Sequence, residues 1–339
     1  MKSHSRAFIL VGLLGAWLPG RALAGIEYYY VSNLDPIYGI SGHAFANENL
    51  GLPPMPTGPA NTAYWSVWGQ TDAAVSQSIV GWNLGDFTGA TVPGPLLNYQ
   101  VGYDPASYGG SAVEIHTETD GTTTYPVFGA MMNTWNYQRH IDPYDLAAAQ
   151  VKYRWPPSED KRPWAHGNTS VFHFSFQLQV PSVYVTPGAR AYIGPVFTVD
   201  DMSQPGRYFW INLNVLDNTG DPNHPGVTVE SISWDLGTGT AQVGSYLGNG
   251  TQYVTKASSS YSSTTVPWTG WRWYGFSVSY AQLQQMINDV NQKFPDSNFS
   301  TNPGDYRIGM LMIDAEIAWP LGNAYLGYST YGISAYSVY

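Results

Sequence analysis

The sequence predicts an all-β fold, an antiparallel β-sandwich of the jelly-roll type. Short segments in which apolar and polar residues alternate recur along the chain, Gly- and Pro-rich segments separate them, and only two segments have helical periodicity. Aromatic residues make up 15% of the chain, including 26 Tyr and 13 Trp, as is typical of β-rich proteins. A membrane β-barrel is the competing all-β fold, and the aromatic C-terminal residue Tyr339 is compatible with it. Amide and histidine side chains opposite Phe on the strands favour the sandwich.

The first 24 residues have the pattern of an export signal. Lys2 and Arg6 precede an apolar segment, residues 7–19, and Ala22-Leu23-Ala24 is a small-x-small cleavage sequence. The apolar segment is too short to cross a bilayer comfortably, so we expect cleavage after Ala24 and a secreted or periplasmic protein. Residues 25–339 are then expected to form one large β domain. The polar residues 156–167 are interpreted either as a surface loop or as a boundary between two halves.

Net charge limits the partners that are expected, and the absence of cysteine limits how the fold can be stabilised. The formal net charge is −10, and it falls to about −13 without the signal, which carries three basic residues and no acidic one. Nucleic acid is therefore not expected as a partner, because its phosphates require basic groups. No later segment resembles a membrane span. The chain contains no Cys, so an exported domain must rely on a large core, which about 315 residues can supply.

Strand signals dominate the mature sequence. The clearest is at residues 172–180, where Phe and aliphatic residues alternate with His, Ser and Gln, as in a sheet with one buried face. Asp120-Gly121 is a strong signal for a two-residue hairpin, whereas residues 32–62 are rich in Gly, Pro and Asn and are expected to be loops. Strands are expected at residues 26–31, 64–67, 77–82, 96–101, 112–119, 122–128, 172–180, 190–199, 208–216, 227–234, 240–247, 253–259, 271–278, 307–319 and 326–339.

Two helices are expected between the strands. Residues 279–294 carry apolar side chains at helical spacing, Ser279 and Gln282 match a capping box, and Pro295 ends the segment. A shorter helix is expected at about residues 143–149, with Pro143 at its first position.

The first candidate site is a group of ionisable residues on one strand. Glu114, His116 and Glu118 alternate along residues 112–119 and would share one face. Two carboxylates at this spacing suit glycosidic-bond hydrolysis, and His116 could tune a pKa or contact a ligand. Charged residues beside a hairpin are also common on solvated faces, so a purely structural role is the alternative.

The second candidate site is the pair Asp314 and Glu316. Both lie on one face of an otherwise apolar strand, where carboxylates are costly unless they are paired or line a cleft. Crowding would raise one pKa and leave the other group ionised, as an acid and nucleophile pair requires. An ion pair with Arg307 or Arg272, or a bound calcium ion, is the alternative.

Aromatic and amide side chains form the third candidate site. Trp210 and Asn212 share one strand face, and Trp271 and Trp273 share another. Flat rings beside amides suit sugar binding, because rings stack on the apolar sugar face and amides bond hydroxyl groups. The alternative is that these rings belong to the core.

No resident cofactor is predicted, and a structural calcium ion is the one alternative. Oxygen ligands gather at residues 217–223 and at Asp200-Asp201, although ordinary turn chemistry explains them equally well. Thiol nucleophiles are excluded, and the motifs of serine hydrolases, zinc proteases and phosphate-binding loops are absent from the sequence.

The composition and the rhythm of the strands resemble those of secreted carbohydrate-active β-sandwich proteins, without a signature of one family. This resemblance implies a polysaccharide or glycan ligand. The leading hypothesis is a glycoside hydrolase in which Asp314 and Glu316 are catalytic, Glu114 or Glu118 contributes across a cleft, and aromatic rings hold the sugar. A non-catalytic carbohydrate-binding or adhesion module is the second hypothesis. A structural or membrane-active β protein, with residues 257–265 as an inserting hairpin, is the third.

Overall fold

The computed structural model describes most of the chain that follows the expected signal sequence. The residues it describes are 25–31, 39–45, 62–68, 83–84, 112–120, 122–133, 146–155, 158–218, 230–235, 238–246, 252–258, 267–318 and 322–339. The expected signal peptide, the expected strands at 77–82 and 96–101 and most of the run 257–265 lie outside these residues.

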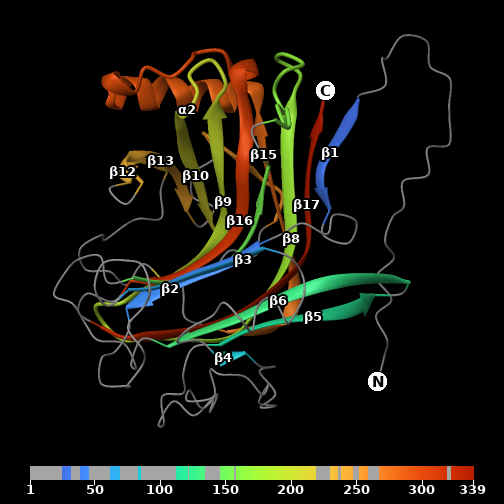
Figure 1. The fold of residues 1–339 in the computed structure, drawn as a ribbon, viewed down its shortest axis with the longest axis vertical. Helices are drawn as coiled ribbons and strands as arrows, with labels where there is room; N and C mark the ends of the chain where they lie inside the picture. Colours follow the sequence, from blue (N-terminus) through green and yellow to red (C-terminus); the bar gives the residue numbers. More distant parts are fainter. Residues whose placement is uncertain are drawn as a thin grey trace.

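Two sheets packed face to face confirm the predicted β-sandwich (Figure 1). Sheet A has eight strands in the order β14-β15-β8-β17-β6-β5-β4, and β1 pairs with β17. Its strands are β1 (Ile26–Val31), β4 (Asn83–Leu84), β5 (Ala112–Asp120), β6 (Thr123–Asn133), β8 (Val171–Val185), β14 (Thr255–Lys256), β15 (Trp268–Ser279) and β17 (Ala324–Val338).

Sheet B has nine strands in the order β12-β13-β10-β9-β16-β7-β2-β3, and β11 pairs with β9. Pairing is antiparallel except between β10 and β13 and between β4 and β5. The strands of sheet B are β2 (Gly39–Phe45), β3 (Thr62–Trp68), β7 (Leu146–Arg154), β9 (Arg190–Asp201), β10 (Tyr208–Asn214), β11 (Leu216–Asp217), β12 (Ser231–Asp235), β13 (Thr240–Tyr246) and β16 (Tyr306–Ala318).

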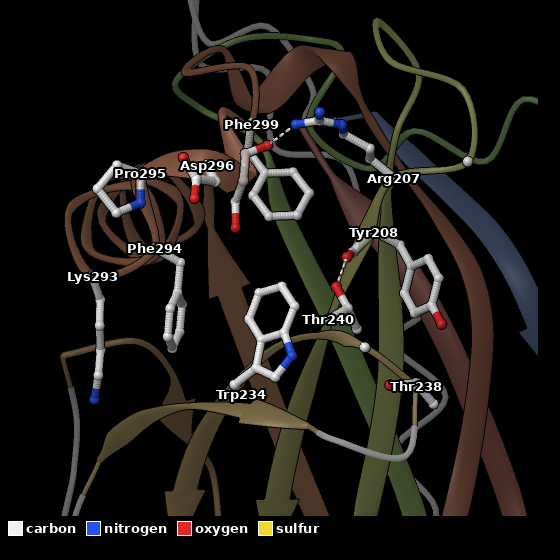
Figure 2. Close-up of a pocket in the computed structure, with 13 residues that line it drawn as sticks. Arg207, Tyr208, Trp234, Thr238, Thr240, Lys293, Phe294, Pro295, Asp296 and Phe299 are labelled. Atoms are coloured by element: carbon white, nitrogen blue, oxygen red, sulfur yellow. Dashed lines mark hydrogen bonds between the residues drawn. The ribbon is translucent and has the colours of Figure 1, made fainter.

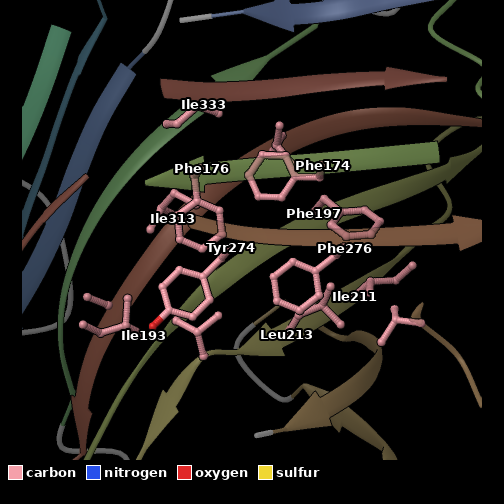
Figure 3. Close-up of a cluster of buried hydrophobic side chains, with 14 of the residues drawn as sticks. Phe174, Phe176, Ile193, Phe197, Ile211, Leu213, Tyr274, Phe276, Ile313 and Ile333 are labelled. Carbon is pink, nitrogen blue, oxygen red and sulfur yellow. The ribbon is translucent and has the colours of Figure 1, made fainter. Parts of the chain in front are cut away.

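The main hydrophobic core lies between the two sheets. The burial pattern of β8 alternates as predicted, with Phe172, Phe174 and Phe176 buried and the intervening residues partly exposed. Figure 3 shows Phe174 and Phe176 of sheet A facing Ile193 and Ile313 of sheet B. Each strand therefore has a core face and a non-core face, which fixes the side of the sandwich on which a polar residue lies.

Helix α2 (Tyr280–Lys293) follows β15 directly and lies across one end of the sandwich (Figure 1). Leu283, Met286, Ile287 and Val290 form its buried face, which confirms the predicted amphipathic helix. Two short 3₁₀ helices, Pro295–Ser297 and Pro303–Asp305, lie between α2 and β16. In the described part of the chain, no helix is long and apolar enough to cross a membrane.

The predicted capping box begins α2. The Gln282 backbone N–H donates to the Ser279 hydroxyl at 3.2 Å, and the Ser279 backbone N–H donates to the Gln282 side chain at 2.9 Å. We expect Ser279→Ala to lower the free energy of unfolding by about 1 kcal/mol, because one N-terminal N–H of the helix loses its partner. Urea unfolding followed by circular dichroism measures this change, and Ser279→Thr, which keeps the hydroxyl, is the control. A loss below about 0.3 kcal/mol would contradict the role of this cap.

The structure corrects two local predictions. The sequence predicts a short helix at about residues 143–149, but residues 146–149 form the start of strand β7. This segment lies between β16 and β2, so backbone pairing on both sides outweighs the local helix preference of its alanines. Within the expected loops at 32–62, residues 39–45 form strand β2, whose Gly- and Ser-rich sequence lacks clear alternation.

Candidate functional site

The non-core face of sheet B carries the main cluster of polar residues. On β16, Leu311, Ile313, Ala315 and Ile317 belong to the core, so Asp314 and Glu316 lie on the opposite face. Strand register continues this face across the neighbouring strands: Glu316 is opposite Tyr192 of β9, and Asp314 is opposite Gln150 of β7. The predicted pair therefore shares one face, as the sequence pattern required.

Glu316 has an unusual environment for a carboxylate. It is largely buried, the Tyr192 hydroxyl donates a hydrogen bond to it, and Arg190 is close enough to act on its charge. Burial raises the pKa of Glu316 to about 7, and the positive charge of Arg190 opposes this shift only in part. At neutral pH a large fraction of Glu316 therefore still carries a proton available for transfer, whereas an ordinary glutamate is ionised.

Asp314 is held differently from Glu316. Its side chain is buried, and the Gln150 amide donates to its Oδ1 at 2.9 Å. Alternate positions on a strand are about 6.5–7 Å apart along the backbone, a spacing that lets two carboxyl groups act on opposite sides of one bond. One strand thus presents two carboxyl groups with different hydrogen-bond partners.

A buried ion pair supports this part of the face. Arg190, at the start of β9, donates through both Nε and a terminal nitrogen to Asp217 of β11, and the Nε to Oδ1 distance is 2.9 Å. The Asn214 amide donates to the same carboxylate at 3.0 Å. The Arg190 guanidinium also lies 4.7 Å from the centre of the Tyr192 ring. Arg190 therefore positions Tyr192, which in turn contacts Glu316.

Trp210 lines a pocket of about 720 Å³ on the same face, towards the α2 end. Its indole N–H donates to the Thr238 hydroxyl at 2.9 Å, and its ring meets Tyr208 edge to face at 5.8 Å. The pocket extends to Met310, which lies four residues before Asp314 on β16, or about 13 Å along the strand. Asn212 is buried one step further along β10, opposite Val196, and does not line the pocket.

The two acidic residues of this pocket already have protein partners. Arg307 donates to Asp200 at 2.8 Å, and Asp201 accepts hydrogen bonds from Ser203 and from the Ser300 backbone. Asp217, the first residue of the proposed calcium loop, is likewise bound by Arg190. Among the described residues no cluster of three metal-ligating side chains is present. A structural calcium ion at residues 217–223 stays a prediction, because positions 219–223 lie outside the described residues.

A second pocket, of about 510 Å³, adjoins the first at the end of α2 (Figure 2). The two share Gly206, Arg207 and Tyr208 in their walls. Figure 2 shows the rings of Trp234 and Phe294 facing the pocket, and these rings meet edge to face at 5.2 Å. Aromatic rings therefore line the edge of sheet B on both sides of Tyr208.

The other predicted site residues lie on sheet A, on the side of the sandwich away from Asp314. In the β5–β6 register Glu114, His116 and Glu118 are opposite Gly129, Val127 and Tyr125, whereas positions 113 and 115 are opposite the core residues Ala130 and Phe128. These three positions are therefore on the non-core face of sheet A. On β15, Tyr274 belongs to the core, so Trp271 and Trp273 lie on the non-core face of sheet A as well.

The structure thus divides the predicted site residues into two groups on opposite sides of the sandwich. Asp314, Glu316, Trp210 and Asn212 lie on sheet B, and the remaining five lie on sheet A. Glu114 and Glu118 do not share a strand face or a sheet with the Asp314 pair. Tyr192, Arg190 and Gln150 were missed, because nothing in the sequence places β9 and β7 beside β16.

Comparisons with known proteins give a distant structural likeness. No protein-family model and no curated protein sequence matches the chain. A loop-swap mutant of Xyn11A from Neocallimastix patriciarum aligns with 63% of this chain and 92% of its own, at 7% identity and a TM-score of 0.29. The family 11 xylanase of the same organism aligns with 66% of this chain and 94% of its own, at 7% identity and a TM-score of 0.28. At TM-scores this low, neither structure assigns an activity to this chain.

Proposed function

We propose that the protein is a glycoside hydrolase that acts on a polysaccharide outside the cytoplasm. The observation that carries this proposal is the pair Asp314 and Glu316 on one strand face, with Glu316 largely buried against Tyr192 and its pKa raised to about 7. Two carboxyl groups in contrasting environments are the arrangement from which an acid and a carboxylate partner are built.

Each carboxyl group has a separate part in the proposed reaction. Glu316, in its protonated form, donates its proton to the oxygen of the bond that breaks, so that the leaving sugar departs as a neutral alcohol. In the proposed reaction Asp314 is the carboxylate that stabilises the positive charge developing on the sugar ring, or that activates the attacking water. The Gln150 amide fixes the orientation of Asp314, and the Tyr192 hydroxyl fixes that of Glu316.

The Trp210 pocket supports a polymeric substrate. The pocket and the carboxylate pair share one face of β16, separated by about 13 Å along the strand. An extended oligosaccharide stacked on Trp210 and lying along β16 would direct its neighbouring sugars towards Asp314. The pocket itself contributes binding, because both of its acidic residues are engaged by protein groups.

That last observation also favours a second candidate function, a module that binds glycans without cleaving them. The two functions are separated by incubating the purified protein with a panel of polysaccharides and measuring both new reducing ends and retention on the polymer. New reducing ends support the hydrolase, retention without cleavage supports the binding module, and neither result on any polymer would overturn both.

Trp210→Ala tests the pocket under either function. We expect about a fivefold weaker affinity for soluble oligosaccharides of the polymer that is bound, because the loss of one stacked ring removes about 1 kcal/mol of binding free energy. Isothermal titration calorimetry measures the affinity. Tyr184→Ala, which removes an exposed aromatic ring of sheet A, is the matched control and is expected to bind like the wild type. Equal affinity of the Trp210→Ala variant would remove the pocket from the proposed site.

A further inference from the structure

The non-core face of sheet A carries exposed aromatic rings in rows that cross the strands. Trp273 of β15, Gln177 of β8 and Tyr331 of β17 are neighbours in one row. Trp273 is 47% exposed, an unusually high value for an indole. Trp271 meets the Tyr331 ring edge to face at 4.5 Å. These residues form a group of neighbouring rings beside an amide.

The Trp273 ring packs on the backbone of β15 at Gly275. A Cβ atom placed on Gly275, two residues further along the same face, would lie 2.3 Å from the far edge of that ring. The six-membered part of the indole therefore occupies the space that any larger residue at 275 would fill. Resting on the strand in this way, the ring keeps one side against the sheet and the other side open to a ligand.

A second row of rings lies four residues further along the sheet. His173 of β8 stacks on Tyr336 of β17 at 4.9 Å, and Tyr336 contacts Tyr28 of β1 at 5.5 Å. Tyr28 is 61% exposed. The row between the two aromatic rows consists of Gly275, Ser175 and Ser334. Four residues span about 13 Å of strand, so the two aromatic rows are separate contact lines on one surface.

Charge and side-chain type point to the chemistry of the occupant. Among the described residues of these three rows, the side chains are aromatic, amide, hydroxyl, imidazole or hydrogen, with no carboxylate, Lys or Arg; the carboxylate positions of this face, Glu114 and Glu118, are further across the sheet, on β5. The chain as a whole has a net charge of −10, which repels anionic polymers and membranes. Aliphatic side chains, which protein interfaces bury, are also absent from these rows. An uncharged ligand with flat apolar faces and many hydroxyl groups fits such a surface.

We propose that Trp271, Trp273, Tyr331, Tyr336 and Tyr28 form a second glycan-binding surface, which attaches the protein to an uncharged insoluble polysaccharide. This ring platform lies on the opposite side of the sandwich from Asp314 and Glu316, so it does not depend on the proposed catalytic pair. The protein would then hold an extended polymer on sheet A whether or not sheet B cleaves one.

The test is sedimentation with insoluble polysaccharides, comparing neutral cellulose, chitin and xylan with anionic pectate. We expect the wild type to sediment with at least one neutral polymer and not with pectate. Trp273→Ala should weaken this binding about tenfold, and the Trp271→Ala/Trp273→Ala variant should weaken it further. Gly275→Val keeps both indoles, but its side chain fills the space in which the Trp273 ring packs. It should therefore weaken binding as Trp273→Ala does. Thermal unfolding verifies that each variant is folded.

Two controls separate this platform from the proposed active site. Glu316→Gln should sediment like the wild type whatever its activity, and Trp210→Ala should lose much less binding to the insoluble polymer than Trp273→Ala does. Binding that Glu316→Gln or Trp210→Ala abolishes, or that both tryptophan variants retain, would overturn the platform. So would a wild type that binds none of the neutral polymers. Self-association that Trp273→Ala removes, measured by analytical ultracentrifugation without polysaccharide, would instead assign the surface to a second copy of the chain.

Discussion

Glu316→Gln is expected to lower the rate of polysaccharide hydrolysis by a factor of about 10²–10⁴ while the protein keeps its fold, because an amide cannot supply the proton. In the wild type, burial raises the pKa of Glu316 to about 7. The rate should therefore fall as pH rises through about 7, because the acid loses the proton it must donate. Reducing-end assays across pH 4.5–8.5 measure both the loss and the alkaline limb.

The same variant also has a signature in stability, which tests the raised pKa of Glu316 independently of activity. The pKa of Glu316 is 4.5 in its ordinary state and about 7 in the folded protein, so the folded state binds this proton more tightly than the unfolded state does. The stability it contributes is complete below pH 4.5 and is lost as pH rises through about 7, a loss of about 3 kcal/mol. Glu316→Gln escapes this loss, so its stability relative to the wild type should increase between pH 4.5 and pH 8.

Two further variants sharpen the test. Asp314→Asn should also lose most activity, because the developing positive charge loses its carboxylate partner, whereas Glu159→Gln, in an exposed loop, should change neither activity nor stability. Unchanged turnover in Glu316→Gln would exclude Glu316 as the acid. A wild-type alkaline limb that survives in Glu316→Gln would assign that limb to another group.

Local patterns in the sequence predicted those elements whose environment is regular along the chain. Strand β8 has one face in the core over its first ten residues, so alternation alone located it and oriented Phe172, Phe174 and Phe176. For helix α2, the capping residues Ser279 and Gln282 mark the start, and four apolar residues at helical spacing mark the buried face. Residues 146–149 differ, because their strand is imposed by neighbours on both sides rather than by their own preference.

The composition of the candidate site depended on information that no local pattern holds. Asp314 and Glu316 were predicted as site residues because a carboxylate on an apolar strand is costly to bury unless it is paired or lines a cleft. Which strands flank them follows from sheet order, so Tyr192 and Gln150 could not be anticipated. Sheet order also separates Glu114 from Asp314: both lie on polar strand faces, but the faces belong to different sheets. Alternation identifies a face of a strand and says nothing about the side of the sandwich to which that face belongs.

The ion pair between Arg190 and Asp217 should have the largest effect on stability of any single contact near the site. The Asp217 side chain is fully buried, and that of Arg190 is 14% exposed. Arg190→Ala would leave a buried carboxylate without its cationic partner, and we expect the free energy of unfolding to fall by about 3–5 kcal/mol. Guanidinium unfolding followed by tryptophan fluorescence measures this change.

The double variant Arg190→Met/Asp217→Leu separates the cost of a lone buried charge from the value of the pair. Replacing both partners by apolar residues leaves no charge behind, so most of the lost stability should return. Activity should not return with it, because Arg190 also packs on Tyr192 and opposes the rise in the Glu316 pKa. Without the guanidinium the pKa of Glu316 rises further, and the alkaline limb should move to higher pH in any activity that remains. A double variant as unstable as Arg190→Ala would show that a lone buried charge does not account for the loss. An unshifted alkaline limb would show that Arg190 supports the fold without acting on Glu316.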